Sequence, residues 1–206
     1  MPMPTAVLLS GRGSNFAALL AAIDQGEVDA HIVLVVADRE AAGLDLAAAR
    51  GIPTAIIRRK DFASLADFDA ANLAALHQSG AQLVVLAGYL SIVGPALVAA
   101  YPHAIINVHP ALLPSFGGPG YYGHHVHQAV LDAGCKLSGA TVHFVSEQVD
   151  AGPIIAQAAV PVCDDDDASA LAARVLQQEH LLLPQAVGWF AAGRIAVEGR
   201  RVKIAR

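Results

Sequence analysis

The feature that most constrains the fold is a regular alternation of short apolar runs with longer amphipathic segments. The runs are rich in Val, Ile and Leu, as buried strands are, and the segments between them have helical spacing. This alternation predicts a mostly parallel sheet with helices on both faces, because parallel strands need crossover connections. The expected strands are Thr5–Leu9, Ile32–Ala37, Thr54–Ile57, Leu83–Ala87 and Ala104–Val108. The expected helices are Asn15–Asp24, Ala42–Arg50, Ser64–Ser79 and Gly94–Ala100.

The pattern changes after His109. Residues 110–125 are rich in Gly, Pro and aromatics and predict a long ordered loop, and the acidic run Asp164–Asp167 suits the N-terminus of a long helix. The later elements expected are a helix over 126–133, strands over 139–146 and 154–162, a helix from 168 to about 190, and a hairpin of 195–197 with 202–204. The sequence therefore predicts one α/β domain over 1–206, a doubly wound sheet with a C-terminal antiparallel extension. Its halves would be about 1–100 and about 101–206.

Composition limits the classes of partner. The chain has 206 residues, of which 55% are hydrophobic and 15% charged, and its formal net charge is -5. This balance gives no reason to expect a nucleic-acid partner, so an anionic ligand would need a local pocket. Cys135 and Cys163 lie far apart and form no CxxC motif, which suits a reducing compartment.

The expected location is the cytoplasm, because the N-terminus lacks the layout of a signal peptide. The uncharged stretch Leu83–Tyr101 approaches the length of a membrane span. Gly88, Ser91, Gly94 and Pro95 interrupt it, and basic flanks are missing. A buried strand, a loop and a short helix explain this stretch better, and we expect no membrane partner.

A glycine-rich turn, Ser10-Gly11-Arg12-Gly13-Ser14-Asn15, lies between the first expected strand and helix. Backbone N–H groups of such a turn can approach an anion, and the helix N-terminus adds partial positive charge. The turn lacks the Gly-Lys-Ser/Thr of a P-loop, and Phe16 stands where a dinucleotide fingerprint has a third glycine or alanine. We therefore expect a monophosphate site; the alternative is a tight turn in which Asn15 caps the helix.

The sequence Asn107-Val108-His109-Pro110 ends a central strand. Strand alternation puts Asn107 and His109 on the same side, where an amide donor and a histidine could bind an oxyanion and manage a proton. Asp150 lies in the turn Val149-Asp150-Ala151-Gly152-Pro153, and near His109 it would favour the imidazolium form. The alternatives are a histidine satisfied beside a loop and an Asp that only closes a turn.

Two further patterns point to ligands less directly. Glu179, which follows Gln178 in the last long helix, could accept hydrogen bonds from a ribose diol, or could be a solvated helix residue. His124, His125 and His127 cluster near one another, but the chain has no HExxH and Cys135 has no ligand spacing, so we expect no metal. No GxSxG elbow supports a covalent serine mechanism.

Several segments in this order resemble the phosphoribosylglycinamide formyltransferases, folate-dependent enzymes of purine synthesis. The resemblance spans nearly the whole chain, and its most specific parts are the HPxLLP segment His109–Pro114 and the downstream Asp-x-Gly-Pro at Asp150–Pro153. The segments that carry it are Ser10–Asn15, Val85–Tyr89, Ile106–Pro114, Gly139–Val145, Asp150–Ile154 and Gln178–His180. It implies a Rossmann-like formyltransferase fold and 10-formyltetrahydrofolate as co-substrate.

The resemblance also implies roles for residues. Asn107, His109 and Asp150 would form a catalytic trio that stabilises the tetrahedral intermediate. The acceptor, glycinamide ribonucleotide, would be held through its phosphoribosyl group by Gly13, Ser14, Asn15, Gln178 and Glu179. The folate would lie along Leu90, Ser91, Ile92 and Val93 and against Ser146, Glu147, Gln148 and Val149. The protein would be a monomer or a homodimer.

Three positions depart from the family pattern. Ser91 and Leu65 stand where members often carry basic residues near the folate. The loop Phe116–Gly123 is longer than in the commonest form, and Pro119 stands where the variant branch usually has lysine. These changes leave the trio intact and bear on contacts with the folate tail.

Other activities are open alternatives. A related hydrolase releases formate from formyl-folate but carries an additional N-terminal domain. Formylation of initiator methionyl-tRNA would need a C-terminal domain and a basic RNA-facing surface. A nucleotide-binding, non-catalytic or redox module is suggested by Gly11-Arg12-Gly13 with Asp38 after the second strand, although Phe16 disfavours it.

Overall fold

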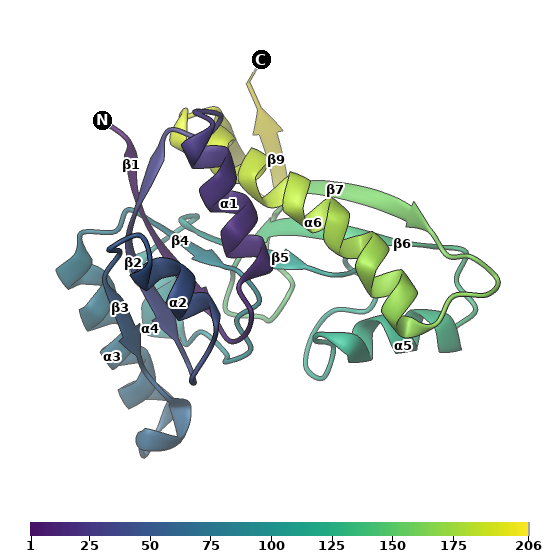
Figure 1. The fold of residues 1–206 in the computed structure, drawn as a ribbon, viewed down its shortest axis with the longest axis horizontal. Helices are drawn as coiled ribbons and strands as arrows, with labels where there is room; N and C mark the ends of the chain where they lie inside the picture. The colour runs from purple at the N-terminus through teal and green to yellow at the C-terminus, as the bar shows by residue number, and fades with distance from the viewer. Residues whose placement is uncertain (206) are drawn as a thin grey trace. The chain divides into compact units, whose positions relative to one another are not determined.

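The computed structural model describes residues 1–205, and the chain divides into two compact units, Met1–Ile106 and Asn107–Arg206. The first unit is built on parallel strands in the order β3-β2-β1-β4 (Figure 1). These strands are β1 (Met3–Leu9), β2 (Ala30–Ala37), β3 (Thr54–Ile56) and β4 (Leu83–Leu86). Their Val and Leu side chains are buried most fully in β1 and β4, as strands covered on both faces require.

Helices connect the strands of this unit. They are α1 (Ser14–Asp24), α2 (Gly43–Ala48), α3 (Leu65–Ser79) and α4 (Pro95–Ala100), and a 3-10 turn, η1 (Arg59–Asp61), precedes α3. The Ser64 side chain caps α3 by accepting a hydrogen bond of 3.1 Å from the Asp67 N–H, and Gly80 ends that helix at φ +72°. In Figure 1, α1 and α2 lie in front of the strands of their unit. The loops that follow β1, β2 and β4 therefore open on one edge of the sheet.

The second unit begins within β5 (Ile105–His109), whose last three residues belong to it. Its strand order is β5-β6-β7-β9-β8, in which β6 with β7 and β8 with β9 are antiparallel pairs. The remaining elements are α5 (His124–Asp132), β6 (Leu137–Phe144), β7 (Ile154–Pro161), α6 (Ala168–Ala191), β8 (Ile195–Glu198) and β9 (Arg201–Ile204). Helix α6 packs along β6 and β7, with α5 against it (Figure 1).

The C-terminal acidic run behaves as expected. Asp167 is the N-cap of α6, and its Oδ1 accepts a hydrogen bond of 2.7 Å from the Ala170 N–H. Leu171, Val175 and Leu183 of α6 are buried, and together with Val142 and Phe144 of β6 they form much of the core of this unit. The Asp167 carboxylate thus pairs a backbone N–H in the first turn of α6 that has no partner within the helix.

The predicted fold is confirmed: the protein is α/β, with a mostly parallel sheet and a C-terminal antiparallel strand pair. The boundaries differ slightly, since β1 and β6 begin two residues earlier than expected and η1 was not predicted. The stretch 83–101 is β4, a loop and α4, as its interruptions predict. No helix in the described part of the chain has the length and apolarity that a membrane span requires.

Candidate active site

The end of β5 carries the central polar pair of the second unit. Asn107 is half-buried, His109 is 4% exposed, and Val108 between them is buried on the other side of the strand. The chain then turns through the cis Leu113–Pro114 peptide into the loop 110–123. The Leu113 N–H donates a hydrogen bond of 3.0 Å to Thr141 Oγ1, which donates in turn to the Ala111 carbonyl at 2.6 Å. The loop after the pair is thus fixed to β6.

Asp150 reaches this pair from the turn between β6 and β7. It adopts φ +55°, a left-handed conformation that non-glycine residues rarely occupy. The turn passes close to β6, because a Cβ built on Gly152 would lie 1.8 Å from the Phe144 carbonyl oxygen. The Phe144 N–H also donates to the Pro153 carbonyl at 2.9 Å. A glycine at 152 is therefore needed to place the Asp150 carboxylate inside the unit, where its side chain is 11% exposed.

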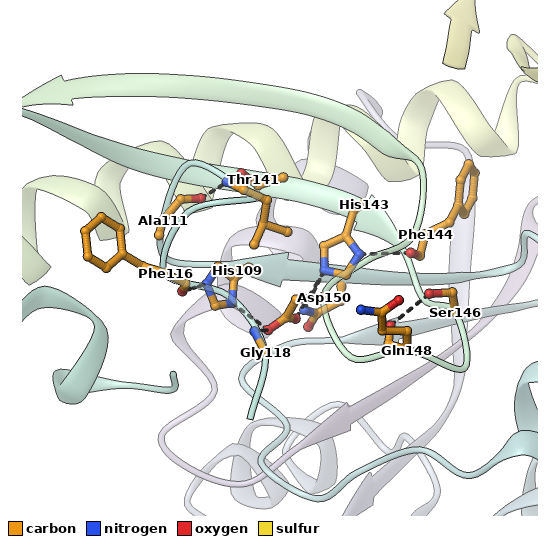
Figure 2. Close-up of polar contacts among 12 residues, drawn as sticks. His109, Ala111, Phe116, Gly118, Thr141, His143, Phe144, Ser146, Gln148 and Asp150 are labelled. Atoms are coloured by element: carbon orange, nitrogen blue, oxygen red, sulfur yellow. Dashed lines mark hydrogen bonds and ion pairs between the residues drawn. The ribbon is translucent and has the colours of Figure 1, made fainter. Parts of the chain in front are cut away.

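The contacts of Asp150 and His109 show which atoms hold protons (Figure 2). His109 Nε2 lies 2.7 Å from the Phe116 carbonyl, which can only accept, so Nε2 carries a proton. His109 Nδ1 faces Asp150 Oδ2 at 3.5 Å. The Gly118 N–H donates to the same Oδ2 at 2.8 Å. One carboxylate oxygen thus ties the loop 110–123 to the histidine.

Burial has the largest effect on the pKa of His109. It lowers the pKa of the His109 imidazole and outweighs the opposite effects of the Asp150 carboxylate and the Phe116 carbonyl. Burial therefore favours the neutral imidazole, against the effect of the Asp150 carboxylate that the sequence predicts. Burial would raise the pKa of the Asp150 carboxyl, but contacts with His143, the Gly118 N–H and His109 outweigh it, and the net pKa is lowered. Asp150 is ionised.

A second buried histidine joins the trio. His143 of β6 is 1% exposed; its Nε2 lies 3.0 Å from Asn107 Nδ2 and 3.6 Å from Asp150 Oδ1. Asp150 therefore lies between two imidazoles, with one oxygen toward each (Figure 2). Asn107, His109, Asp150 and His143 form one connected polar cluster, although Asn107 reaches the carboxylate only by way of His143.

The glycine-rich turn of the first unit is fixed by backbone packing. Gly13 has φ +76° and is the N-cap of α1, and a Cβ on it would lie 2.9 Å from the Gly43 Cα. The Gly43 N–H donates to the Gly11 carbonyl at 3.1 Å. Asn15 is the second residue of α1 rather than its cap, so the capping alternative is wrong. The turn leaves Ser14 exposed at the start of the helix.

A cationic pocket lies beside the loop 90–93 of the same unit. Ser91 Oγ donates to Asp38 Oδ2 at 2.7 Å, and Arg39 binds both oxygens of Asp38, at 2.8 and 3.1 Å. The Leu90 N–H donates to Ser10 Oγ at 2.8 Å, which anchors the loop to the base of the glycine-rich turn. The pocket encloses about 340 Å³ and is lined by Asp38, Arg39, Arg58, Arg59, Lys60 and Ser91. Four cations and one carboxylate thus line the pocket; Arg39 pairs with that carboxylate, and Arg58 pairs with Glu40 outside the lining.

Residues 3–187 match the formyl transferase family. This match includes most of each unit, with the whole of the polar cluster and the glycine-rich turn. The chain belongs to the formyl transferase family.

Curated members of the formyl transferase family resemble most of the chain. It is 41% identical over 194 residues to the chloroplastic phosphoribosylglycinamide formyltransferase of Arabidopsis thaliana. The matched region covers 92% of this chain and 66% of that protein. It is 36% identical to the phosphoribosylglycinamide formyltransferase of Haemophilus influenzae, covering 94% of this chain and 89% of that protein. Against the trifunctional purine biosynthetic protein adenosine-3 of Bos taurus, at 42% identity, the chain spans 19% of the longer protein. The chain thus spans only part of the length of some curated relatives.

Solved formyl transferase structures share the fold. The glycinamide ribonucleotide transformylase 1 of Symbiobacterium toebii superposes with a TM-score of 0.94 at 39% identity, covering 100% of this chain and 95% of that one. A formyltetrahydrofolate deformylase of Pseudomonas syringae superposes with a TM-score of 0.88 at 27% identity, covering 99% of this chain and 66% of that one.

Of the predicted ligand-binding residues of this formyl transferase, Gly13, Asn15 and Glu179 are buried, and the others are exposed or half-buried. Glu179 is 8% exposed within α6, so the alternative of a solvated helix residue is wrong. Gln178 beside it is half-buried. Leu90 and Ile92 are exposed, whereas Ser91 and Val93 are half-buried. Ser146 Oγ donates to the Gln148 carbonyl at 2.8 Å and shapes the second predicted folate segment, 146–149 (Figure 2).

Sequence reasoning missed three parts of the site. His143 was visible only as one letter of the Gly139–Val145 motif, and strand alternation places it on the same face as Thr141 without naming its partners. The Phe116 carbonyl and the Gly118 N–H are backbone groups, which no residue pattern specifies. Within residues 1–205, no group of three or more His, Cys, Asp or Glu side chains gathers as metal ligands.

Proposed function

We propose that this protein transfers the formyl group of 10-formyltetrahydrofolate to the amine of glycinamide ribonucleotide, a step of purine biosynthesis. The observation that carries the proposal is the buried cluster of Asn107, His109 and Asp150 in a formyl transferase. The names of the Arabidopsis and Haemophilus relatives support the choice of acceptor.

The proposed reaction is direct, without a covalent enzyme intermediate. The acceptor amine attacks the formyl carbon, a C–N bond forms, and the carbonyl electron pair moves to the formyl oxygen. An Asn107 N–H stabilises that oxyanion. His109, neutral at rest, takes up the proton that leaves the amine, and Asp150 stabilises the imidazolium so formed. The proton then reaches the folate nitrogen, the bond from that nitrogen to the formyl carbon breaks, and the carbonyl re-forms.

We assign the phosphate of the acceptor to Gly13, Ser14 and Asn15. The left-handed Gly13 starts α1, and N–H groups of the first turn of a helix suit an anion. We assign the ribose to Glu179 and Gln178, because buried Glu179 is a carboxylate that a diol can bind. These assignments concern two units, and each is supported by the geometry within its own unit.

We assign the folate to Leu90, Ser91, Ile92 and Val93 and to Ser146, Glu147, Gln148 and Val149. Formyl-folate ends in glutamate carboxylates, and the cationic pocket that includes Ser91 offers Arg59 and Lys60 to such anions, beside Arg58, which pairs with Glu40. Leu65 and Ser91 carry no charge where family members often have basic residues. The η1 segment nevertheless supplies cations to this pocket. The exposed Pro119 adds no charge to the loop 110–123.

The rival activity with a specific observation behind it is hydrolysis of formyl-folate, because the Pseudomonas deformylase shares the fold. The relatives named formyltransferases are more similar in sequence, at 36% to 41% identity against 27%. We therefore place transfer before hydrolysis. The monomer or homodimer and the cytoplasmic location stay predictions, as does the single domain over 1–206.

The test is to supply purified protein with 10-formyltetrahydrofolate, with and without glycinamide ribonucleotide, and to follow both formylated ribonucleotide and formate. We expect formylated ribonucleotide only when the acceptor is present, and little formate without it. Formate released at the same rate with and without acceptor would support the hydrolase instead.

A further inference from the structure

The proposed reaction gives no task to His143, a buried polar side chain of the second unit. His143 lies in the middle of the cluster, is 1% exposed, and contacts both Asn107 and Asp150. Its ring is held from two sides. The contacts of its two nitrogens are enough to assign its protonation and its role.

The first contact fixes the tautomer. His143 Nδ1 lies 2.8 Å from the carbonyl oxygen of Phe144 (Figure 2). A carbonyl oxygen accepts and cannot donate, so Nδ1 carries the proton. In a neutral ring the other nitrogen, Nε2, then has only a lone pair to offer.

The second contact is consistent with the first. His143 Nε2 lies 3.0 Å from Asn107 Nδ2, an amide nitrogen that can only donate. A neutral ring with its proton on Nδ1 satisfies both contacts, whereas an imidazolium would point an N–H of Nε2 at the N–H of Asn107. With the Asn107 amide nitrogen toward His143, the two contacts fit the neutral Nδ1–H form.

The hydrogen bond accepted by His143 Nε2 fixes the orientation of the Asn107 amide. One of the two amide hydrogens binds His143, so the amide is held with its nitrogen on this side and the second hydrogen is left for another acceptor. If His143 offered no acceptor, the amide could rotate by half a turn and present its oxygen in place of its nitrogen. An oxygen facing the developing oxyanion would repel it, and the donor would be lost.

From this geometry we infer that His143 is a positioning residue: as the neutral Nδ1–H tautomer it orients the Asn107 amide so that its nitrogen faces the reacting formyl oxygen. The inference rests on the proposed function for the identity of that oxygen. His143 exchanges no proton with the substrates. Asp150 Oδ1 lies 3.6 Å from Nε2, beside this contact, and the other carboxylate oxygen, Oδ2, accepts the hydrogen bond from the Gly118 N–H.

Two amide substitutions separate this role from acid–base catalysis. In His143→Asn the side-chain nitrogen occupies the place of Nδ1 and can still donate to the Phe144 carbonyl, but the side chain is too short to reach Asn107. In His143→Gln the longer side chain can offer Oε1 near the place of Nε2 as an acceptor for Asn107. Neither amide titrates, so a proton-transfer role would be lost equally in both.

We expect His143→Asn to lower kcat about 10- to 100-fold, approaching the loss of an oxyanion donor, with little change in KM. His143→Gln should recover most of that loss and keep the pH profile of the parent protein. Equal losses in the two variants, or an undiminished kcat in a folded His143→Asn, would overturn the inference. Matching thermal unfolding midpoints of the two variants would show that a difference in kcat does not come from folding.

A second measurement does not depend on activity. Ring nitrogen NMR of the parent protein, labelled with nitrogen-15 on histidine, should show His143 as the Nδ1–H tautomer at neutral pH. An Nε2–H tautomer or an imidazolium would overturn the inference. If the parent protein fails to formylate glycinamide ribonucleotide, the proposed function is contradicted. The NMR result would still test the tautomer of His143.

Discussion

The two units of the protein place their polar groups by different means. In the first unit, the glycine-rich turn is shaped by backbone contacts with Gly43, and the cations of the pocket are at most half-buried. In the second unit, His109, His143 and Asp150 are largely buried, and carbonyl and N–H groups fix their orientation. The difference supports the proposal that the turn and the pocket of the first unit hold charged parts of ligands, whereas the buried cluster of the second unit orients groups that react. Substitutions at the glycine-rich turn and the cationic pocket should therefore alter affinity, whereas substitutions in the buried cluster should alter turnover.

The largest effect should come from the carboxylate of the second unit. Asp150→Asn keeps the shape and an acceptor for the Gly118 N–H but removes the charge beside His109 Nδ1. We expect kcat to fall about 100- to 1,000-fold, because the imidazolium formed during transfer loses its counter-charge. Steady-state rates of formylated ribonucleotide formation measure this. The control is Asp164→Asn, at an exposed carboxylate paired with Lys136; a comparable loss in the control, or an unchanged kcat in Asp150→Asn, would contradict the assignment.

A change in the first unit should act on stability and on acceptor binding. Gly13→Ala places a Cβ 2.9 Å from the Gly43 Cα at φ +76°. Gly26→Ala is a matched control, since Gly26 has φ +75° and no described heavy atom lies within 4 Å of its added Cβ. The left-handed conformation alone costs about 1–2 kcal/mol, so both variants should lose that much. Gly13→Ala should lose more in denaturant unfolding and also raise KM for the ribonucleotide; equal losses would show that the contact with Gly43 relaxes freely.

A smaller effect is expected at the cationic pocket. Arg59→Gln combined with Lys60→Gln removes two of its four cations. Partly exposed ion pairs contribute up to about 1 kcal/mol each, so KM for formyl-folate should rise about 3- to 10-fold while kcat stays unchanged. The control is Arg200→Gln in the turn between β8 and β9, which should leave KM unaltered. Titrating folates that carry one or several glutamates against both proteins would show whether the carboxylates are recognised here.

The smallest effect should be the pH dependence. Burial lowers the pKa of His109 below 6.5, so the imidazole stays neutral at pH 7 and gains a proton only as the pH falls further. Because the neutral form accepts the proton from the amine, kcat/KM should be flat above pH 6.5 and decrease below it, by no more than about fourfold at pH 6. The free energy of unfolding should decrease over the same acidic range, since the unfolded chain binds the proton more readily than the folded one. A rise in kcat/KM on acidification would contradict a neutral resting His109.

The sequence specified more of the fold than of the site. The alternation of β-branched runs and helical segments predicted the parallel strands, and strand periodicity placed Asn107 and His109 on one side of β5. The turn pattern predicted the effect of Asp150 on His109, but not the burial of the His109 ring, which lowers its pKa and depends on the whole unit. The contact of His143 with Asn107 joins two strands, so no local pattern shows it. The Phe116 carbonyl, the partner of His109 Nε2, depends on a loop conformation at φ +52° rather than on residue type.

The central claim is that the buried cluster of the second unit carries the chemistry. Its most direct test is the single-turnover rate of formyl transfer with both substrates saturating, compared between Asn107→Ala and Ser14→Ala. Saturation removes differences in affinity, so the rate reports the reacting groups alone. We predict a decrease of about 100-fold in Asn107→Ala and a rate within about threefold of the parent in Ser14→Ala. A decrease of similar size in both variants, or a near-parental rate in Asn107→Ala, would contradict the assignment of chemistry to the second unit.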